Sequence, residues 1–203
     1  RLRARLKIRT RVLRLINATK TQSKINTDLL IVDDFFPHPL SPFRYTEYSE
    51  YLKHFNKIKI ITNGQSLPCI NEVKSMQNII DEFLNKFPAF KSKLAVYQPI
   101  ISYNAKLVYA TFLGNTVHFD LGYSLKVPFI VNLYPGGMLQ VNDKLIDSYL
   151  KKYLCSPYCK KVIVTQNYVY SYLLDNKLCP EEKIEFIFGV VTPLKLLDIK
   201  IQK

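Results

Sequence analysis

The chain has 203 residues, 48% of them hydrophobic, and a formal net charge of +13 at pH 7. A domain of about 150 residues already buries roughly 70% of its unfolded surface, so this length can form a core without disulfides or metals. No uninterrupted run of about 18 apolar residues occurs, which excludes an obvious transmembrane span. No signal-peptide pattern follows Arg1. Because the first residue is Arg rather than Met, we expect a fragment or a trimmed product.

The positive charge is concentrated at the N-terminus. Residues 1–24 hold nine of the 29 Lys and Arg residues and no acid, whereas the remaining chain carries 20 bases against 16 acids. Basic and apolar residues alternate with a strand period as far as Val12, yet the leucines also fit one face of a helix. Three interpretations stay open: a solvated arm, a helix on an anionic membrane surface, or, least favoured, a nucleic-acid contact. The arm and a polar linker extend to residue 27.

The four cysteines are Cys69, Cys155, Cys159 and Cys179. The closest pair, Cys155 and Cys159, is separated by three residues, one of them a proline, and the histidine nearest to this pair, His118, is distant in sequence. A zinc site would need further Cys or His residues nearby at spacings of two to four residues, so the sequence predicts no metal site. Free thiols in a reducing cytosol are expected.

Short apolar runs alternate with amphipathic segments from Asp28 onward. The runs are almost continuously apolar, which is typical of strands that are covered on both faces. The expected strands are residues 28–32, 57–62, 94–98, 106–112, 128–133, 161–165 and 183–188.

Helices are expected between these strands. Ser41 and Pro42 supply an N-cap and a first-turn proline for a helix that runs to about Phe55. Alternating strands and helices predict βαβ units, and therefore an α/β, doubly wound, Rossmann-like parallel sheet. The other expected helices start at Asn71, Gly114–Asn115, Asn142–Asp143 and Asn167. Apolar residues expected to point inward are Val73, Met76, Ile80, Phe83, Leu84 and Phe87 in the helix from Asn71, Val117, Leu121 and Leu125 in the helix from Gly114–Asn115, and Leu145, Tyr149 and Leu150 in the helix from Asn142–Asp143.

Ligands of such a sheet bind beyond the carboxyl ends of the strands, where the strand order switches. The loop after residues 28–32 contains Phe36, His38 and Ser41, and it leads into a helix N-terminus, which favours anions. It has no glycine, so it is neither a dinucleotide fingerprint nor a P-loop. Arg44 could pair a phosphate or a carboxylate, or be a solvated charge. His38 is either a catalytic base or a plainly exposed loop histidine.

Two later loops at the same edge carry further candidates. Asn115 lies in a turn after the fourth expected strand, and His118 is either a catalytic residue or a partly buried structural histidine. Tyr134, Gly136 and Gly137 follow the fifth expected strand. They form either a turn that lets strand and helix pack closely, or a cleft wall where the glycine amides approach a ligand.

The order of these motifs resembles the N-terminal, acceptor-side domain of GT-B glycosyltransferases, and most closely their family 4, the retaining, glycogen-synthase-like group. The similarity covers about residues 28–193. It rests on VPFIVNLYPGG as the strand and loop of the interdomain cleft, on KKVIVTQNYVYSYLL as a strand that ends in a polar residue, Gln166, and on PEEKIEFIFGVVTP. The last segment is similar to the family's I-x-x-G-V signature, where Gly189 would mark the passage to a second domain.

The resemblance implies transfer of a sugar from a nucleotide-sugar donor to a hydroxyl of a glycan or lipid-linked acceptor, with retention, no obligatory metal and no other cofactor. The N-terminal domain would supply the acceptor side, and a C-terminal domain most donor contacts, including two acids seven residues apart. Residues 194–203 leave no room for that domain, so we expect a half-enzyme that needs a missing domain or a partner chain. A cytoplasmic location, peripheral on the inner membrane face, would suit it.

Two features depart from the family. The first loop is FFPHPLSP rather than glycine-rich, and Tyr134 stands where many members have a histidine, a role that His38 or His118 could take. The competing interpretation is a non-catalytic α/β binding or scaffold module, tethered to a membrane or to nucleic acid by residues 1–27.

Overall fold

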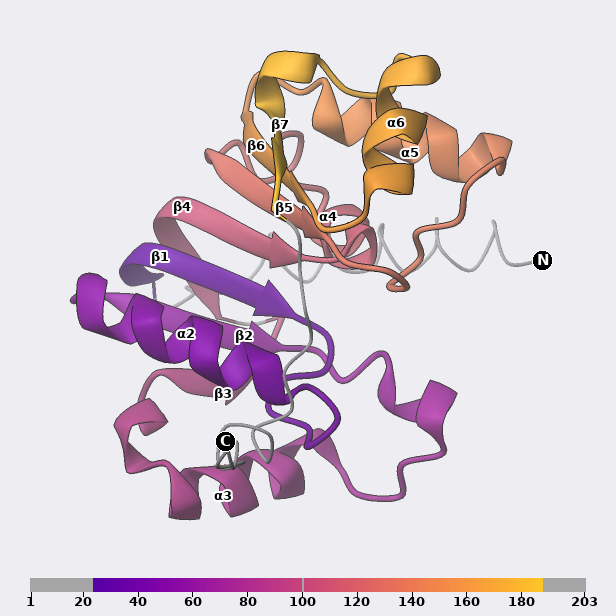
Figure 1. The fold of residues 1–203 in the computed structure, drawn as a ribbon. Coiled ribbons are helices and arrows are strands. Elements are labelled where there is room, and N and C mark those ends of the chain that lie inside the picture. The colour runs from indigo at the N-terminus through magenta and orange to yellow at the C-terminus, as the bar shows by residue number, and fades with distance from the viewer. Residues whose placement is uncertain (1–23, 100, 188–203) are drawn as a thin grey trace, which may run out of the picture.

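The computed structural model describes residues 24–99 and 101–187 (Figure 1). Most of the expected basic arm and linker lies outside these residues, as do Gly189 and the tail at 194–203. The interpretations of these segments, and the domain boundaries expected at 27 and 193, therefore stay predictions.

Within the described residues, one parallel sheet of seven strands has the order β3-β2-β1-β4-β5-β6-β7. Every strand expected from the apolar runs is present, including the short one within residues 94–98. The α/β, doubly wound, Rossmann-like fold is thereby confirmed. The strands are β1 (Lys24–Asp33), β2 (Ile58–Thr62), β3 (Leu94–Val96), β4 (Ser102–Thr111), β5 (Phe129–Leu133), β6 (Cys159–Val164) and β7 (Ile184–Phe186).

Helices cover opposite faces of the two halves of the sheet (Figure 1). The two helices after β1 and β2 pack on one face, and the three helices after β4, β5 and β6 pack on the other. The strand order therefore switches between β1 and β4. The helices are α2 (Pro42–His54), α3 (Met76–Lys86), α4 (Leu113–His118), α5 (Lys144–Leu154) and α6 (Asn167–Asp175), with 3₁₀ helices η1 (Leu67–Ile70), η2 (Pro88–Phe90) and η3 (Glu181–Lys183).

The interior strand β1 contributes to a separate core on each face. Leu29 and Ile31 pack in the cluster under α2 and α3, whereas Leu30 and Val32 pack in the cluster under α4, α5 and α6. Side chains of a strand alternate between faces, so a strand covered on both sides must be apolar at every position. This is why the continuous apolar runs identified the strands correctly.

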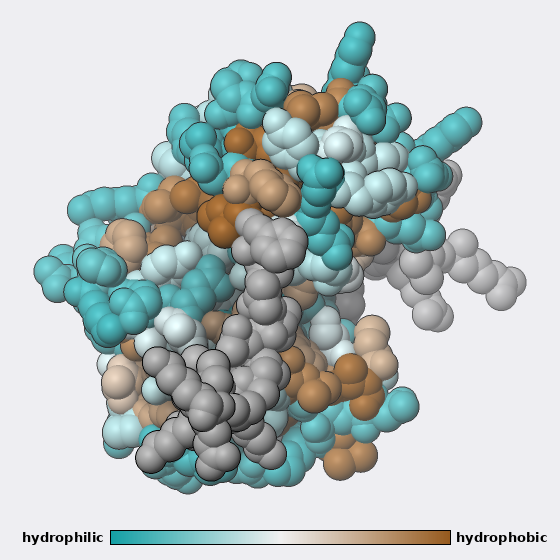
Figure 2. All heavy atoms as spheres, viewed as in Figure 1, coloured by the Kyte–Doolittle hydropathy of each residue, from teal (hydrophilic) through white to brown (hydrophobic). Residues whose placement is uncertain are grey.

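The outermost strand β7 leaves hydrophobic side chains at the surface. Brown atoms reach the face shown in Figure 2 around β7, among a mostly hydrophilic periphery. Phe186 is 42% exposed although its ring contacts Tyr170 of α6 at 6.0 Å between centroids. β7 pairs with β6 alone, so its other backbone edge is unpaired within the described residues.

The predicted start of α3 at Asn71 is wrong. Asn71 has φ of +53° and ends η1, and Val73, expected to point inward, is 96% exposed. The helix begins after Ser75, whose hydroxyl accepts a hydrogen bond from the amide of Asn78 at 3.2 Å. Asn tolerates the left-handed region, whereas Ser in extended backbone caps a helix well.

The predicted inward stripes of two other helices are also partly wrong. Helix α4 already ends at His118, so Leu121 and Leu125 lie beyond it and form an isolated bridge, although Leu121 is still buried. In α5, Leu145 is 43% exposed and Ile146 is the buried residue of that turn. The hydrophobic pattern identified core residues here but not the element that carries them.

The four cysteines are free thiols. Cys69 and Cys155 are exposed, whereas Cys159 and Cys179 are buried, and burial raises the pKa of Cys159 to about 12. Among the described residues, no three His, Cys, Asp or Glu side chains are grouped as a metal site. None of the helices in this part of the chain has the length and apolarity needed to cross a bilayer.

Asp143 gives a direct test of helix capping in α5. Its Oδ1 accepts hydrogen bonds from the amides of Leu145 at 2.8 Å and Ile146 at 3.1 Å. We expect Asp143→Ala to lower the free energy of unfolding by about 1 kcal/mol, seen as a fall in Tm of about 2–4 °C. Asp143→Asn keeps the acceptor and is the matched control. Equal Tm values for the two variants would contradict the capping role.

Candidate functional site

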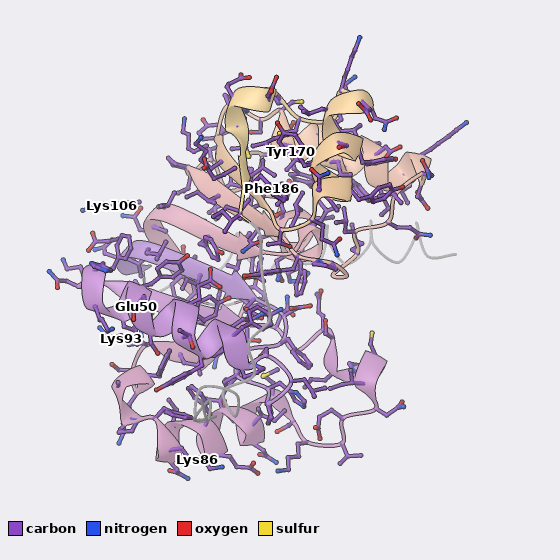
Figure 3. All side chains as sticks on the ribbon, in the orientation of Figure 1. Glu50, Lys86, Lys93, Lys106, Tyr170 and Phe186 are labelled. Carbon is purple, nitrogen blue, oxygen red and sulfur yellow. The ribbon has the colours of Figure 1, made fainter. Side chains whose placement is uncertain are left out.

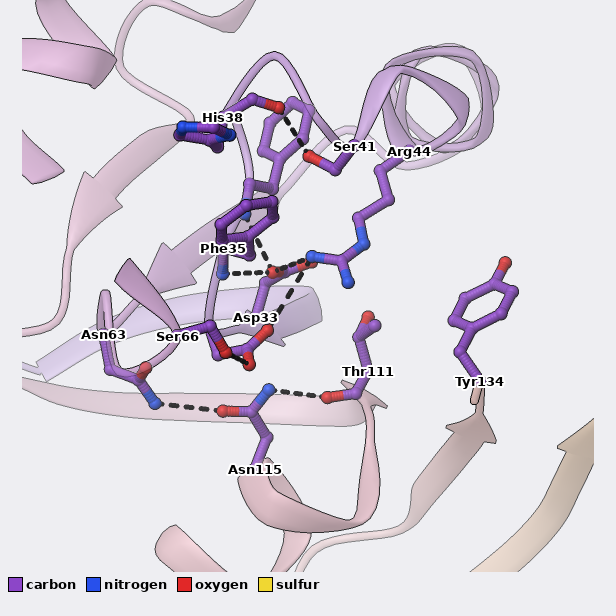
Figure 4. Close-up of polar contacts among 12 residues, drawn as sticks. Asp33, Phe35, His38, Ser41, Arg44, Asn63, Ser66, Thr111, Asn115 and Tyr134 are labelled. Atoms are coloured by element: carbon purple, nitrogen blue, oxygen red, sulfur yellow. Dashed lines mark hydrogen bonds and ion pairs between the residues drawn. The ribbon is translucent and has the colours of Figure 1, made fainter. Parts of the chain in front are cut away.

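The carboxylate of Asp33, at the carboxyl end of β1, is the centre of a buried polar cluster (Figure 4). Its Oδ1 accepts hydrogen bonds from the amides of Phe35 at 2.7 Å and Phe36 at 2.9 Å. Its Oδ2 accepts one from the hydroxyl of Tyr48 at 2.5 Å, which lies 2.8 Å from the hydroxyl of Thr111 at the end of β4. This carboxylate thus connects β1, the following loop, α2 and β4 at the point where the strand order switches.

Arg44 completes the cluster. Its Nη1 donates to Asp33 Oδ1 at 2.5 Å, and the side chain is almost fully buried, with 2% of the residue exposed. The guanidinium also lies over the ring of Phe112, 4.8 Å from its centroid. The alternative of a solvated charge is therefore wrong, and the partner of Arg44 is a carboxylate of the chain itself. We call Asp33, Arg44, Tyr48 and Thr111 the switch-point cluster.

Asp34 sits beside the switch-point cluster without joining it fully. Its Oδ2 accepts a hydrogen bond from the hydroxyl of Ser66, in the loop after β2. Its Oδ1 is buried without a hydrogen-bond partner and lies 3.8 Å from Arg44 Nη1. Burial and then the negative charge of Asp33 raise the pKa of Asp34.

Glu47 forms a second polar group on the same side of α2. Its Oε1 accepts hydrogen bonds from the hydroxyls of Tyr109 at 2.5 Å and Tyr51 at 3.0 Å, and its Oε2 is 3.5 Å from the hydroxyl of Tyr134. Asn132 of β5 donates to the Tyr109 hydroxyl at 2.8 Å. Burial raises the pKa of Glu47, although the tyrosine hydrogen bonds partly offset the effect. Burial and then the charge of Glu47 raise the pKa of Tyr134 to about 12.

The sequence did not single out Glu47, but α2 contains a signal. Arg44, Glu47, Tyr48 and Tyr51 recur at the spacing of one helix face. A stripe that combines charged and aromatic residues on a helix expected to pack on a sheet indicates a buried polar network.

Two amide side chains, Asn63 and Asn115, extend the polar groups at the carboxyl ends of the strands toward β2. Asn63 Nδ2 donates to Asn115 Oδ1 at 3.0 Å, and Asn115 Nδ2 donates to the carbonyl of Thr111 at 2.5 Å (Figure 4). His118 is exposed, so the expectation of a partly buried histidine is wrong. Its Nδ1 lies 2.9 Å from Nε2 of Gln65. Sequence reasoning identified Asn115 and His118, and the structure brings both to the loop after β2.

The two glycines after β5 differ in their surroundings. Gly137 has φ of +55°, and a Cβ there would lie 2.1 Å from Cγ of Phe112, whereas a Cβ on Gly136, at φ of +93°, would meet nothing within 4 Å. The close approach at Gly137 is therefore made to Phe112, and its carbonyl also accepts a hydrogen bond from the amide of Gly114 at 3.0 Å. This contact favours the packing turn at Gly137, while Gly136 is an exposed turn residue.

Three other predicted site residues, Phe36, His38 and Ser41, line a cavity of about 690 Å³ between the loop after β1 and α3. His38 is buried, so the alternative of an exposed loop histidine is wrong. Its Nδ1 accepts a hydrogen bond from the amide of Leu40 at 3.2 Å, which leaves Nε2 to donate to Glu72 Oε2 at 3.1 Å. The hydroxyl of Ser41 donates to the carbonyl of His38 at 2.8 Å rather than capping α2.

Gln166 is separate from both groups. It is the exposed N-cap residue of α6, at the end of β6, and β4 and β5 lie between that strand and β1. The predicted residues therefore fall into a polar edge at the switch point, a cavity beside it, and one outlying residue.

The chemistry available at the switch point is hydrogen bonding. The positive charge of Arg44 is neutralised by Asp33, so this guanidinium is not free to bind a phosphate. The partly exposed Asn63 and Tyr134 and the exposed His118 also lie at this edge, where Asn63 is bonded to Asn115 and to the amide of Gln65, and Nδ1 of His118 lies 2.9 Å from Nε2 of Gln65. Such groups suit the hydroxyls of a polar ligand.

Comparison of the chain with protein-family models, with curated proteins and with solved structures finds no match.

Breaking the buried ion pair should be costly. Arg44→Met leaves the carboxylate of Asp33 buried without its counter-charge, and we expect a loss of about 3–5 kcal/mol in the free energy of unfolding. The double variant Asp33→Asn with Arg44→Met should lose less than the sum of the two single variants, because no uncompensated charge remains. Urea unfolding measures all three. Lys53→Met, which removes an exposed pair with Glu50, is the control and should change little. Additive losses would show that the two side chains are not coupled.

Glu47 should make stability depend on pH. Its pKa in the folded chain is raised above the ordinary value of 4.5, so its contribution is fully present below pH 4.5 and is lost as the pH rises through the raised pKa. The stability of the unaltered chain relative to Glu47→Gln should therefore fall as the pH increases through this window, as measured by urea unfolding. Glu50→Gln is a control of opposite sign, because Lys53 lowers the pKa of Glu50. The same slope in both comparisons would contradict the assignment.

Proposed function

We propose that this chain is the acceptor-side domain of a retaining, GT-B-type glycosyltransferase, which transfers a sugar from a nucleotide-sugar donor to a hydroxyl of a glycan or lipid-linked acceptor. The sequence motifs that resemble this family support the proposal, and so does the doubly wound parallel sheet that it requires. Within the proposal, the protein works in the cytoplasm, and residues 1–24 hold it on an anionic membrane surface.

The observation that carries the proposal is that the charge of Arg44, at the carboxyl ends of the strands, is neutralised by Asp33. Transfer from a nucleotide sugar needs the charge of the leaving diphosphate to be stabilised and the acceptor hydroxyl to be oriented. Arg44 is already paired with Asp33, so the switch point suits the second task and not the first. The proposal therefore assigns the donor phosphates to a second domain or a partner chain.

Among the two histidines, His118 fits the orientation of an acceptor hydroxyl better than His38. His118 is exposed, with its Nδ1 2.9 Å from Nε2 of Gln65 in the loop after β2, whereas His38 is buried and bonded to Glu72. Tyr134 would form the facing side of the site, held by the aromatic rings of Phe43 at 5.2 Å and Phe112 at 6.1 Å.

One observation favours a second candidate, a non-catalytic α/β binding module. The polar groups of the switch-point cluster bond chiefly to one another, as they would in a structural network. Such a module would bind a partner through the same edge without turning over a substrate.

The two candidates differ in sugar binding. We expect saturation-transfer NMR to detect methyl glycosides and disaccharides on the chain, and to detect UDP, GDP and ADP only weakly. His118→Ala should reduce the glycoside signal several-fold because it removes a hydrogen-bonding group from the edge, while Lys53→Ala, on the outer side of α2, should leave it unchanged.

A second assay tests the enzyme itself. Release of nucleoside diphosphate from a panel of nucleotide sugars is measured with the full product of the gene and with this chain alone. Activity of the full product supports the proposal. If the folded chain binds no glycoside and the full product releases no nucleoside diphosphate, the proposal is contradicted and the non-catalytic binding module is the remaining candidate.

A further inference from the structure

The cavity beside the loop after β1 has a separate set of walls from the switch-point cluster. One face of α3 lines it through Ile79, Glu82, Phe83 and Lys86, which recur at the spacing of a single helix face, followed by Phe87. At a rise of 1.5 Å per residue, the span from residue 79 to residue 87 gives the cavity a length of about 12 Å along the helix. Its volume of about 690 Å³ lies in the range of small-molecule sites.

The opposite wall is rigid and mostly apolar. Four side chains of the loop and the start of α2 face α3 there, namely Phe36, Pro37, Pro39 and Pro42, and Tyr45 follows them. The aromatic rings also fix one another, because Tyr45 lies 4.4 Å from Phe87 and Phe36 lies 5.2 Å from Phe83 between centroids. A preformed apolar cavity binds an apolar body at little cost in conformational entropy.

The charged side chains that line the cavity differ in whether they have a polar partner. Lys74 forms an ion pair with Glu82 at 2.7 Å, and Glu72 accepts hydrogen bonds from the amide of Lys74 at 2.8 Å and from Nε2 of His38 at 3.1 Å. Lys86 lines the cavity in the last turn of α3, where Figure 3 labels it, and it has no ion pair or hydrogen bond to the other described residues. Lys86 is therefore the charged side chain of the lining that has no polar partner among the described residues.

The polarity of the cavity follows from this distribution. Glu72 precedes α3 and Lys86 ends it, so an acidic side chain and a free ammonium lie toward opposite ends of the cavity. An anionic group is repelled at the Glu72 end and attracted at the Lys86 end, while the apolar lining between them accepts a chain or ring.

We infer that this cavity binds an anionic amphiphile, a small molecule with an apolar chain or ring body along α3 and one carboxylate, phosphate or sulfate group at Lys86. This binding site is independent of the proposed sugar transfer, because it uses none of the side chains of the switch-point cluster.

Three probes that share one alkyl chain test the inference: decanoate, decanol and decyltrimethylammonium, titrated by calorimetry onto the full chain below their micellar concentrations. We expect decanoate to bind more tightly than decanol, and decyltrimethylammonium to bind most weakly. Lys86→Glu should weaken decanoate binding about fivefold, the effect of one exposed charge interaction, and leave decanol unchanged. Lys91→Glu, the same charge change outside the cavity lining, is the matched control and should bind decanoate normally.

A filling variant separates cavity binding from adsorption. Pro39 is an exposed residue of the lining, so Pro39→Trp should keep the fold, checked by circular dichroism, and should abolish binding of decanoate and decanol alike. Equal affinity for the three head groups, tighter binding of the cation, or binding that survives Pro39→Trp would overturn the inference. Loss of glycoside binding would not affect these results, so failure of this inference and failure of the proposed function remain distinguishable.

Discussion

The structure around the carboxyl edge depends on the need to satisfy one fully buried carboxylate. Asp33 is 0% exposed, and a charge at such depth is tolerated only with a counter-charge and hydrogen bonds to its remaining lone pairs. Two loop amides, the Tyr48 hydroxyl and the Arg44 guanidinium supply them. Because the last two donors are four residues apart on α2, this one carboxylate sets both the rotation of the helix and the path of the loop before it.

The same constraint reaches the loop after β5 through packing. The guanidinium held by Asp33 lies over Phe112, and Phe112 fills the space that a side chain at Gly137 would need. The absence of a Cβ at Gly137 lets the loop close on that ring, which keeps Tyr134 beside Glu47. A glycine pair that suggested a ligand cradle in the sequence is thus, at Gly137, a requirement of the buried ion pair.

The sequence predicted the sheet well because buried parallel strands must be apolar at every position. Helix starts were less certain, since Asn71 and Ser75 are both acceptable capping residues and the choice depends on tertiary packing. The same difference between local signals and tertiary packing holds for the predicted site residues. Loop position placed His38, Ser41 and Asn115 at the carboxyl edge or its cavity. The burial of Arg44 depends on Asp33, eleven residues earlier at the end of β1, and its signal in the sequence is the charged and aromatic stripe of α2. Glu47 was missed because a glutamate within a helix usually faces water.

Amide hydrogen exchange of Phe35 and Phe36 tests the central claim most directly, because both amides donate to Asp33. We expect strong protection of these two amides in the unaltered chain. In a folded Arg44→Met variant they should exchange much faster, while the amide of Ile60, bonded to the carbonyl of Lys93 at 2.8 Å, changes only as far as global stability does. Unchanged protection of Phe35 and Phe36 relative to Ile60 would show that the ion pair does not hold this loop, and would contradict the account.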